Sequence, residues 1–158
     1  MRELRRRSFV AGVGAVAVAG LLPVGDALAA PDNRLIMWRD PGCGCCGVWG
    51  ERVRAAFNRP LMIMQTSDMA AIKRARSVPD DLQSCHTALI SGYVIEGHVP
   101  PADILRLIRS RNRRIAGLAV PGMPAGSPGM DVGHERRDRY QVFAFDARGR
   151  RSVFANHG

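Results

Sequence analysis

Residues 34–57 read RLIMWRDPGCGCCGVWGERVRAAF, and this stretch decides the fold. Residues 34–39 are mostly apolar and predict a β-strand. The next three, Asp40-Pro41-Gly42, are typical of a turn. From 48 to 57 apolar residues recur at helical spacing, which predicts a helix. The sequence therefore places a cysteine cluster, Cys43, Cys45 and Cys46, in the loop between a strand and a helix.

The remaining patterns continue this alternation. Strands are expected at 61–65, 87–91 and 93–96, and helices at 69–76, capped by Ser67 or Asp68, and from Pro100 onward. A last hairpin is expected at 141–146 and 151–155. Residues 117–131 hold three Pro and four Gly, so we expect no regular structure there. The predicted fold is α/β, a thioredoxin-like β-α-β-α-β-β-α order with a C-terminal β-hairpin.

The first 29 residues are typical of a signal peptide. A basic start containing Arg6-Arg7 precedes an uncharged apolar run and an Ala27-Leu28-Ala29 cleavage pattern. The paired arginines resemble a twin-arginine export signal. The apolar run is shorter than the roughly 20 residues of a membrane span, so no stable membrane anchor is expected. We expect cleavage near Ala29 and one exported domain over 30–158.

The composition excludes several classes of function. The formal net charge is +9, but no aromatic residues interleave with the basic clusters, so no nucleic-acid partner is expected. There is no Ser-His-Asp order, paired-carboxylate site, phosphate loop or nucleotide fingerprint. The sequence therefore gives no indication of a common hydrolase or of a nucleotide-binding protein.

The use of the four cysteines is the main clue to function. In an exported protein, two structural disulfides would be the ordinary use. Cys45 and Cys46 are adjacent, and Cys43 is one residue away from Cys45, so at most one easy disulfide is expected, from this loop to Cys85. A helix N-terminus stabilises thiolates. Thiolates favour Cu(I), Zn(II) or iron–sulfur, so the pattern indicates a metal or redox site.

Two histidines are expected near these thiols. Cys85 and His86 precede the strand at 87–91, at a point that faces the cysteine loop in thioredoxin-like folds. His98 follows the predicted hairpin, on a loop close to the same place. The alternative for His98 is a surface histidine, but its neighbours make it a candidate ligand or a partner of one.

Two methionines share a Pro-Gly-Met frame within 117–131. Met123 and Met130 would serve Cu(I) as thioether donors that cannot form disulfides; the alternative is that they cover the core. Met37, Met62 and Met64 lie in expected strands and are expected to be core residues.

The longest motifs are CGCCGVW at 43–49, SCHTALISGYVIEGHVP at 84–100 and GLAVPGMPAGSPGM at 117–130. Together they resemble the exported CopG-type copper-resistance family of thioredoxin-like metal-binding proteins, over about residues 35–154. The resemblance implies a periplasmic protein of copper tolerance. It also implies copper held by Cys43, Cys45, Cys46 and Cys85, as one ion or several bridged by thiolate. His86, His98, Met123 and Met130 match family motif positions and become further donors.

The donor types suggest a redox hypothesis. Cu(I) prefers a few soft ligands, whereas Cu(II) prefers nitrogen and oxygen, and thiols beside histidines offer both. We therefore expect Cu(I)/Cu(II) interconversion, with a periplasmic copper donor or an electron-transfer protein as partner. The sequence leaves open whether the chain is a copper oxidoreductase or a non-catalytic chaperone or buffer. A thiol–disulfide oxidoreductase, from the Cys-x-x-Cys spacing of Cys43 and Cys46, and a structural zinc site are further alternatives.

Overall fold

The computed structural model describes residues 33–133, 135 and 137–158. The expected signal peptide therefore lies outside the described residues. Within them the elements follow the order β1 (Leu35–Arg39), α1 (Gly44–Phe57), β2 (Met62–Gln65), α2 (Met69–Ala75), a 3-10 turn (Asp80–Leu82), β3 (His86–Ile90), β4 (Tyr93–Glu96), α3 (Pro101–Ser110), β5 (Gly117–Ala119), β6 (Tyr140–Phe145) and β7 (Arg151–His157). The predicted β-α-β-α-β-β-α order and C-terminal hairpin are confirmed.

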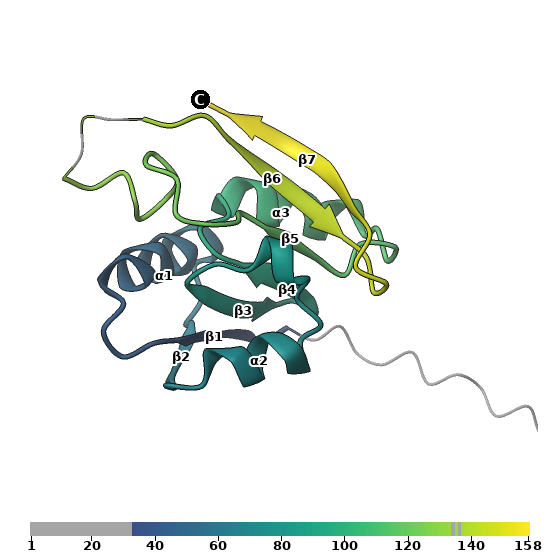
Figure 1. The fold of residues 1–158 in the computed structure, drawn as a ribbon, viewed down its shortest axis with the longest axis horizontal. Helices are drawn as coiled ribbons and strands as arrows, with labels where there is room; N and C mark the ends of the chain where they lie inside the picture. The colour runs from purple at the N-terminus through teal and green to yellow at the C-terminus, as the bar shows by residue number, and fades with distance from the viewer. Residues whose placement is uncertain (1–32, 134, 136) are drawn as a thin grey trace, which may run out of the picture.

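The described strands form one mixed sheet in the order β2-β1-β3-β4-β5-β6-β7 (Figure 1). β1 pairs parallel to β2 and antiparallel to β3, with Arg39 opposite His86. This register brings the end of β1, which leads into the cysteine loop, beside the start of β3. The predicted 87–96 hairpin is confirmed by the antiparallel pairing of β3 with β4.

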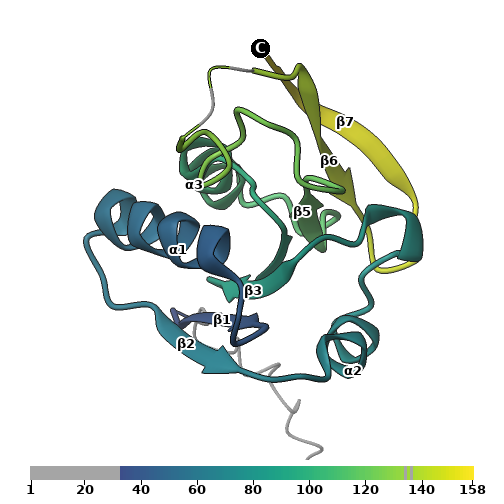
Figure 2. The same ribbon diagram turned by 60° about the vertical axis from the view of Figure 1, so that its left-hand side comes forward.

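The helices lie on both faces of the sheet. α1 and α3 are on one face and α2 is on the other (Figure 2). The local sequence explains their ends: Asp68 caps α2 by accepting a hydrogen bond from the Ala71 N–H at 2.9 Å, and Pro101 opens α3. α1 ends at Phe57, and the C-cap residue Asn58 adopts the left-handed conformation. The site described below lies at the N-terminal end of α1.

The main core lies between the sheet and the α1–α3 layer. Trp49 is fully buried on α1, and its Nε1 donates a hydrogen bond to the Val99 carbonyl at 2.8 Å. This bond ties α1 to the segment between β4 and α3. Other core members are Leu35, Met37, Val53, Ala88, Ile90, Ile95, Ile104, Leu107, Leu118 and Val142.

Two expectations about local structure are wrong. Residues 117–119 form β5, which pairs parallel with β4 and antiparallel with β6 and so joins the C-terminal hairpin to the sheet. The sequence does not predict β5 because the strand is only three residues long and begins with glycine, which has a low β-strand propensity. Glycine is needed at 117, since the Cβ of any other residue would lie 2.1 Å from the Val94 carbonyl oxygen.

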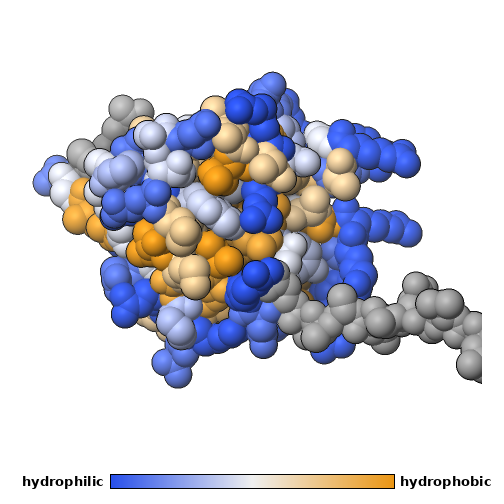
Figure 3. All heavy atoms as spheres, turned by 90° about the horizontal axis from the view of Figure 1, so that it is seen from below, coloured by the Kyte–Doolittle hydropathy of each residue, from blue (hydrophilic) through white to orange (hydrophobic). Residues whose placement is uncertain are grey.

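The second wrong expectation is that Met62 and Met64 of β2 are core residues. Met62 and Met64 are 59% and 45% exposed, because β2 is an edge strand that is open on more than one side; Met37 in β1 is buried as expected. Hydrophobic side chains gather on the face seen from below, the side on which β1, β2 and α2 lie in Figure 1 (Figure 3). Among the described residues, no helix combines the length and the apolar character needed to cross a membrane.

Candidate metal centre

The cysteine cluster begins at the N-cap of α1. Cys43 is the N-cap residue, and its backbone N–H bonds to the Asp40 carbonyl at 3.2 Å, which closes the expected turn. Arg39 donates a side-chain hydrogen bond to the Cys43 carbonyl. Cys45 and Cys46 lie in the first helical turn, where the backbone N–H groups have no partner within the helix. The expected position of the thiols at a helix N-terminus is confirmed.

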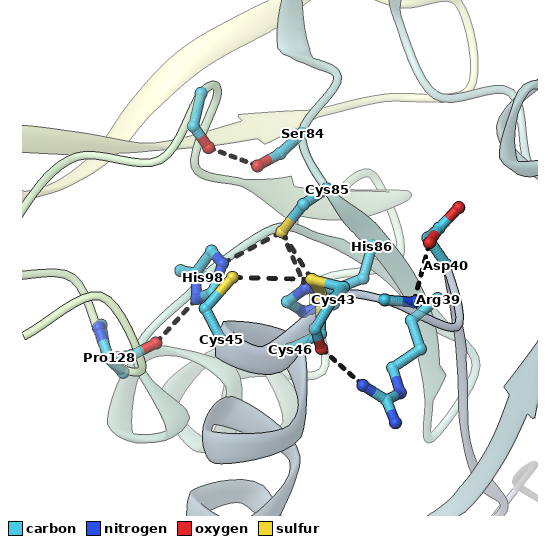
Figure 4. The surroundings of a disulfide bond; sticks show 12 residues. Arg39, Asp40, Cys43, Cys45, Cys46, Ser84, Cys85, His86, His98 and Pro128 are labelled. Carbon is cyan, nitrogen blue, oxygen red and sulfur yellow. Dashed lines mark hydrogen bonds between the residues drawn. A yellow bond between two sulfur atoms is a disulfide. The ribbon is translucent and has the colours of Figure 1, made fainter. Parts of the chain in front are cut away.

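Cys43 and Cys46 form a disulfide, while Cys45 and Cys85 are free thiols (Figure 4). The sequence left at most one easy disulfide, from the loop to Cys85, whereas the disulfide in the structure joins two cysteines of the loop itself. The reason is local: the first turn of a helix brings residues three apart onto the same side. A site of four thiolates requires this disulfide to be reduced.

Cys85 lies just before β3 and faces the cysteine cluster. Its Sγ is 3.6 Å from the Sγ of Cys46, and the Sγ atoms of Cys43 and Cys45 are 3.5 Å apart. The four sulfur atoms lie within 4.8 Å of one another. Burial and the neighbouring Cys45 raise the pKa of Cys85 to about 12, so this thiol carries its proton at neutral pH until a cation replaces it.

His98 completes one side of the cluster. The ring is fully buried, with Nε2 3.0 Å from the Cys85 Sγ and Nδ1 2.8 Å from the Pro128 carbonyl oxygen (Figure 4). Since a carbonyl can only accept, Nδ1 carries the proton, and the Nε2 lone pair faces the thiol. Burial lowers the pKa of His98, which keeps this lone pair available.

His86 lies behind Cys85 in the core. Its Nδ1 is 3.3 Å from the Cys85 Sγ, and its ring lies between those of Trp49 and His98, with centroids 4.3 and 5.1 Å away. Nε2 is buried without a hydrogen-bond partner among the described residues. Burial, His98 and Lys73 lower the pKa of His86 well below its usual range. Cys85, His86 and His98 thus form a second, overlapping donor set.

The two Pro-Gly-Met copies are both anchored beside this cluster. In the first copy, the Gly122 carbonyl accepts a hydrogen bond from the Ser84 hydroxyl, next to Cys85. In the second, Pro128 holds His98, and a Cβ at Gly129 would lie 2.8 Å from the Cys45 carbonyl oxygen. The two loops therefore run close to the candidate ligands.

The methionine side chains themselves differ in exposure. Met123 is 53% exposed, and Met130 is partly buried. The structure brings their backbones near the cysteines and histidines, and their role as donors stays a prediction.

Backbone groups of the loop were missed from the sequence. The Pro128 carbonyl and the close approach of Gly129 orient His98 and Cys45, yet neither has a side chain that signals chemistry. The repeated Pro-Gly-Met frame is the sequence signal that marks both places.

The donor set suits a soft metal ion. Thiolates and neutral imidazoles bind Cu(I), Cu(II) and Zn(II), and hard cations such as Mg²⁺ would need the oxygen donors that this cluster lacks among the described residues. The residues present therefore fit copper through Cys43, Cys45, Cys46 and Cys85, with His86 and His98 as nitrogen donors.

Known proteins agree with this chemistry. Residues 82–130 match a family model described as a protein of unknown function, DUF411. A solved structure named Copper resistance protein CopG, Form 1, is 43% identical; the match has a TM-score of 0.72 and covers 81% of this chain and 98% of that one. The chain belongs to the CopG copper-resistance family. Form 2 of that CopG protein is 42% identical at a TM-score of 0.70, covering 79% and 98%. No curated protein sequence matches the chain.

The family-model match also agrees with the site's position in the chain. The matched 82–130 segment contains Cys85, His86, His98 and both Pro-Gly-Met copies, and α1 supplies the other cysteines. The family resemblance drawn from the sequence motifs is confirmed.

Proposed function

We propose that the chain is a periplasmic copper-binding protein of copper resistance that interconverts Cu(I) and Cu(II). One observation carries this proposal: four sulfur atoms lie within 4.8 Å of one another, and the same Cys85 belongs to a set with two buried imidazoles. A soft site and a harder one therefore share a ligand. The copper-related role of the CopG proteins supports the choice of metal.

The sulfur side of the site suits Cu(I). When the Cys43–Cys46 disulfide is reduced, Cys45, Cys46 and Cys85 can offer three or more thiolates to a trigonal ion, and thiolate bridges let neighbouring ions share a sulfur. The N-terminus of α1 stabilises this negative charge. Met123 and Met130 would add thioethers at the rim.

The nitrogen side suits Cu(II). Neutral His86 and His98, with the shared Cys85, are a two-imidazole, one-thiolate set of the kind that tolerates both oxidation states of copper. The electron balance is simple: the reduced Cys43–Cys46 pair can give two electrons to two Cu(II) ions, which yields two Cu(I) ions, the disulfide and two protons. In the other direction, each Cu(I) gives one electron to an electron-transfer protein.

The test uses protein exported to the periplasm from the full-length gene. The mature N-terminus is read by mass spectrometry, the thiols are reduced under argon, and Cu(I) is titrated with zinc in competition. We expect tight binding of Cu(I) that zinc does not displace and that Cys85→Ser weakens. Displacement by zinc, or equal binding by the variant, would overturn the copper site. Redox activity is tested by adding Cu(II) and counting Cu(I) and remaining thiols together.

A second function has its own observation. The Cys43–Cys46 disulfide at a helix N-terminus, with the Cys85 thiol 3.6 Å from Cys46, is an arrangement that supports thiol–disulfide exchange. Metal-free reduced protein that reduces insulin disulfides, and loses this activity in Cys43→Ser, would favour the exchange reaction. An inactive wild-type protein would leave copper as the reason for the thiols.

A further inference from the structure

A buried ion pair lies directly behind the metal centre. Lys73 of α2 and Glu96 of β4 are in contact, with side-chain exposures of 7% and 0%. Burying two charges has a desolvation cost that their attraction often fails to offset, so such a pair is weak evidence for stability. Its hydrogen bonds indicate another role.

The carboxylate of Glu96 holds both flanks of the Cys85-His86 dipeptide. One oxygen accepts the backbone N–H of Ser84 at 2.6 Å, and the other accepts the hydroxyl of Thr87 at 2.7 Å. Lys73 also donates to the Thr87 hydroxyl, at 3.3 Å. Glu96 therefore holds the chain at Ser84, directly before the two candidate ligands, and at Thr87, directly after them.

The Glu96 carboxylate holds a segment that strand pairing does not hold. β3 begins at His86, so Ser84 and Cys85 precede the strand, and the Ser84 N–H bonds to the carboxylate instead of to a neighbouring strand. Glu96 itself is the last residue of β4, two positions before His98. One buried side chain thus sets the position of Cys85 relative to the strand that leads to His98.

We propose that Lys73 and Glu96 are positioning residues that hold Cys85 against Cys46 and His98 and so complete the copper site. The inference rests on the proposed copper function for its purpose, but the positioning can be measured without metal. Side chains that orient metal ligands typically change metal affinity by about 10- to 100-fold when they are replaced.

The metal-free test measures how readily Cys46 and Cys85 form a disulfide. In a Cys43→Ser/Cys45→Ser background these two thiols remain, 3.6 Å apart in the parent structure. Excess oxidised glutathione is the two-electron oxidant: one thiol forms a mixed disulfide with it, the other closes the Cys46–Cys85 bond, and two reduced glutathione molecules leave. Lys73→Met with Glu96→Met removes both charges and the acceptor. We expect the rate of Cys46–Cys85 bond formation to fall about tenfold, because a displacement of about 1 Å strongly slows reaction between held groups. Lys73→Met with Glu96→Gln keeps an acceptor oxygen for the Ser84 N–H and should restore most of the rate.

The matched control is Asp103→Asn, which weakens the hydrogen bonds of a largely buried carboxylate to Arg106 and His157 rather than to the residues around Cys85. It should lower stability and leave the rate unchanged. Equal rates in the parent and in the Met/Met variant would overturn the inference, as would equal slowing by Asp103→Asn or no rescue by glutamine. The Met/Met variant of the four-cysteine protein should lose about 10- to 100-fold in Cu(I) affinity, and the Met/Gln variant should recover most of it. If the wild-type protein binds no Cu(I), the proposed function fails, while the cross-linking result still decides the positioning role.

Discussion

The imidazole of His98 lies with Nε2 3.0 Å from the Sγ of Cys85. Because Nδ1–H of the same ring donates a hydrogen bond to the Pro128 carbonyl, the lone pair of Nε2 is directed at the thiol. In the metal-free protein the partly buried Cys85 thiol and the buried imidazole share one proton, and both can bind a cation in its place. This pair joins the sulfur and nitrogen sides of the site.

His98→Phe should weaken Cu(II) more than Cu(I), since Cu(II) depends on nitrogen donors. We expect Cu(II) affinity to fall at least about tenfold, equivalent to ~1.4 kcal/mol, with a smaller change for Cu(I). Electron paramagnetic resonance during anaerobic Cu(II) titration measures the first, and competition with a Cu(I) chelator the second. His157→Phe, which changes a histidine bonded to Asp103, is the control. Equal losses of Cu(I) and Cu(II) affinity would show that His98 does not serve Cu(II) in preference to Cu(I).

Reduction of the Cys43–Cys46 disulfide should raise the Cu(I) capacity. The oxidised protein offers the thiols of Cys45 and Cys85 alone, whereas the reduced protein offers four. Cu(I) titrations of desalted protein, with and without earlier treatment with dithiothreitol, measure copper bound per chain. An oxidised protein that binds as much Cu(I) as the reduced one would show that this disulfide does not limit the site.

Gly129→Ala should lift the second Pro-Gly-Met copy away from α1. Gly129 has φ +94°, and an added Cβ would lie 2.8 Å from the Cys45 carbonyl oxygen and 3.2 Å from the Nδ1 of His98. We expect a loss of about 1–3 kcal/mol in the free energy of unfolding from backbone strain, together with weaker copper binding. Gly133→Ala is the matched control, since φ is +77° and nothing lies within 4 Å of the added Cβ. If both variants bind copper as the wild type does, the loop does not support the ligands.

Met130→Leu should reduce Cu(I) affinity more than Met123→Leu. Met130 follows Gly129, which packs on the first turn of α1, whereas the side chain of Met123 is 53% exposed. Leucine conserves volume and removes the thioether, so stability should change by less than about 1.5 kcal/mol. Competitive Cu(I) titration of the two variants measures the difference. Unchanged affinity in both would assign the methionines to covering the fold.

Stability should fall with rising pH above about 10, in part through Tyr140. Burial, Asp103 and Asp131 raise the pKa of Tyr140 to about 12. Between pH 10 and 12 the unfolded chain has already released this proton while the folded chain keeps it, so the free energy of unfolding decreases over that window. Since the ring is half-buried, we expect a contribution of about 1–2 kcal/mol.

Urea unfolding of the wild type and Tyr140→Phe at pH 8, 10 and 11.5 checks this prediction. The variant should lose less stability than the wild type over this range. Both proteins contain Cys85, so the difference between them isolates the tyrosine. Parallel losses would show that Tyr140 does not contribute.

Much of the fold follows from local patterns. The strand–turn–helix start at 34–57, the 86–96 hairpin and the C-terminal hairpin were predictable because alternating or helical periodicity and turn residues act over short distances. β5 and the exposure of Met62 and Met64 were not, because both depend on which strands become neighbours and which strand is left at the edge.

For the site, the sequence by itself determined the chemistry: four thiols, two imidazoles and two thioethers in motifs that indicate a soft metal, with three thiols at a helix N-terminus. Tertiary structure alone decided the rest. It placed Cys85 against Cys46 and His98, and put the Pro128 carbonyl on the imidazole and the Lys73–Glu96 pair behind the ligands. Residue types set which ions can bind, whereas distances between groups far apart in the chain depend on sheet register and packing, which no local pattern encodes.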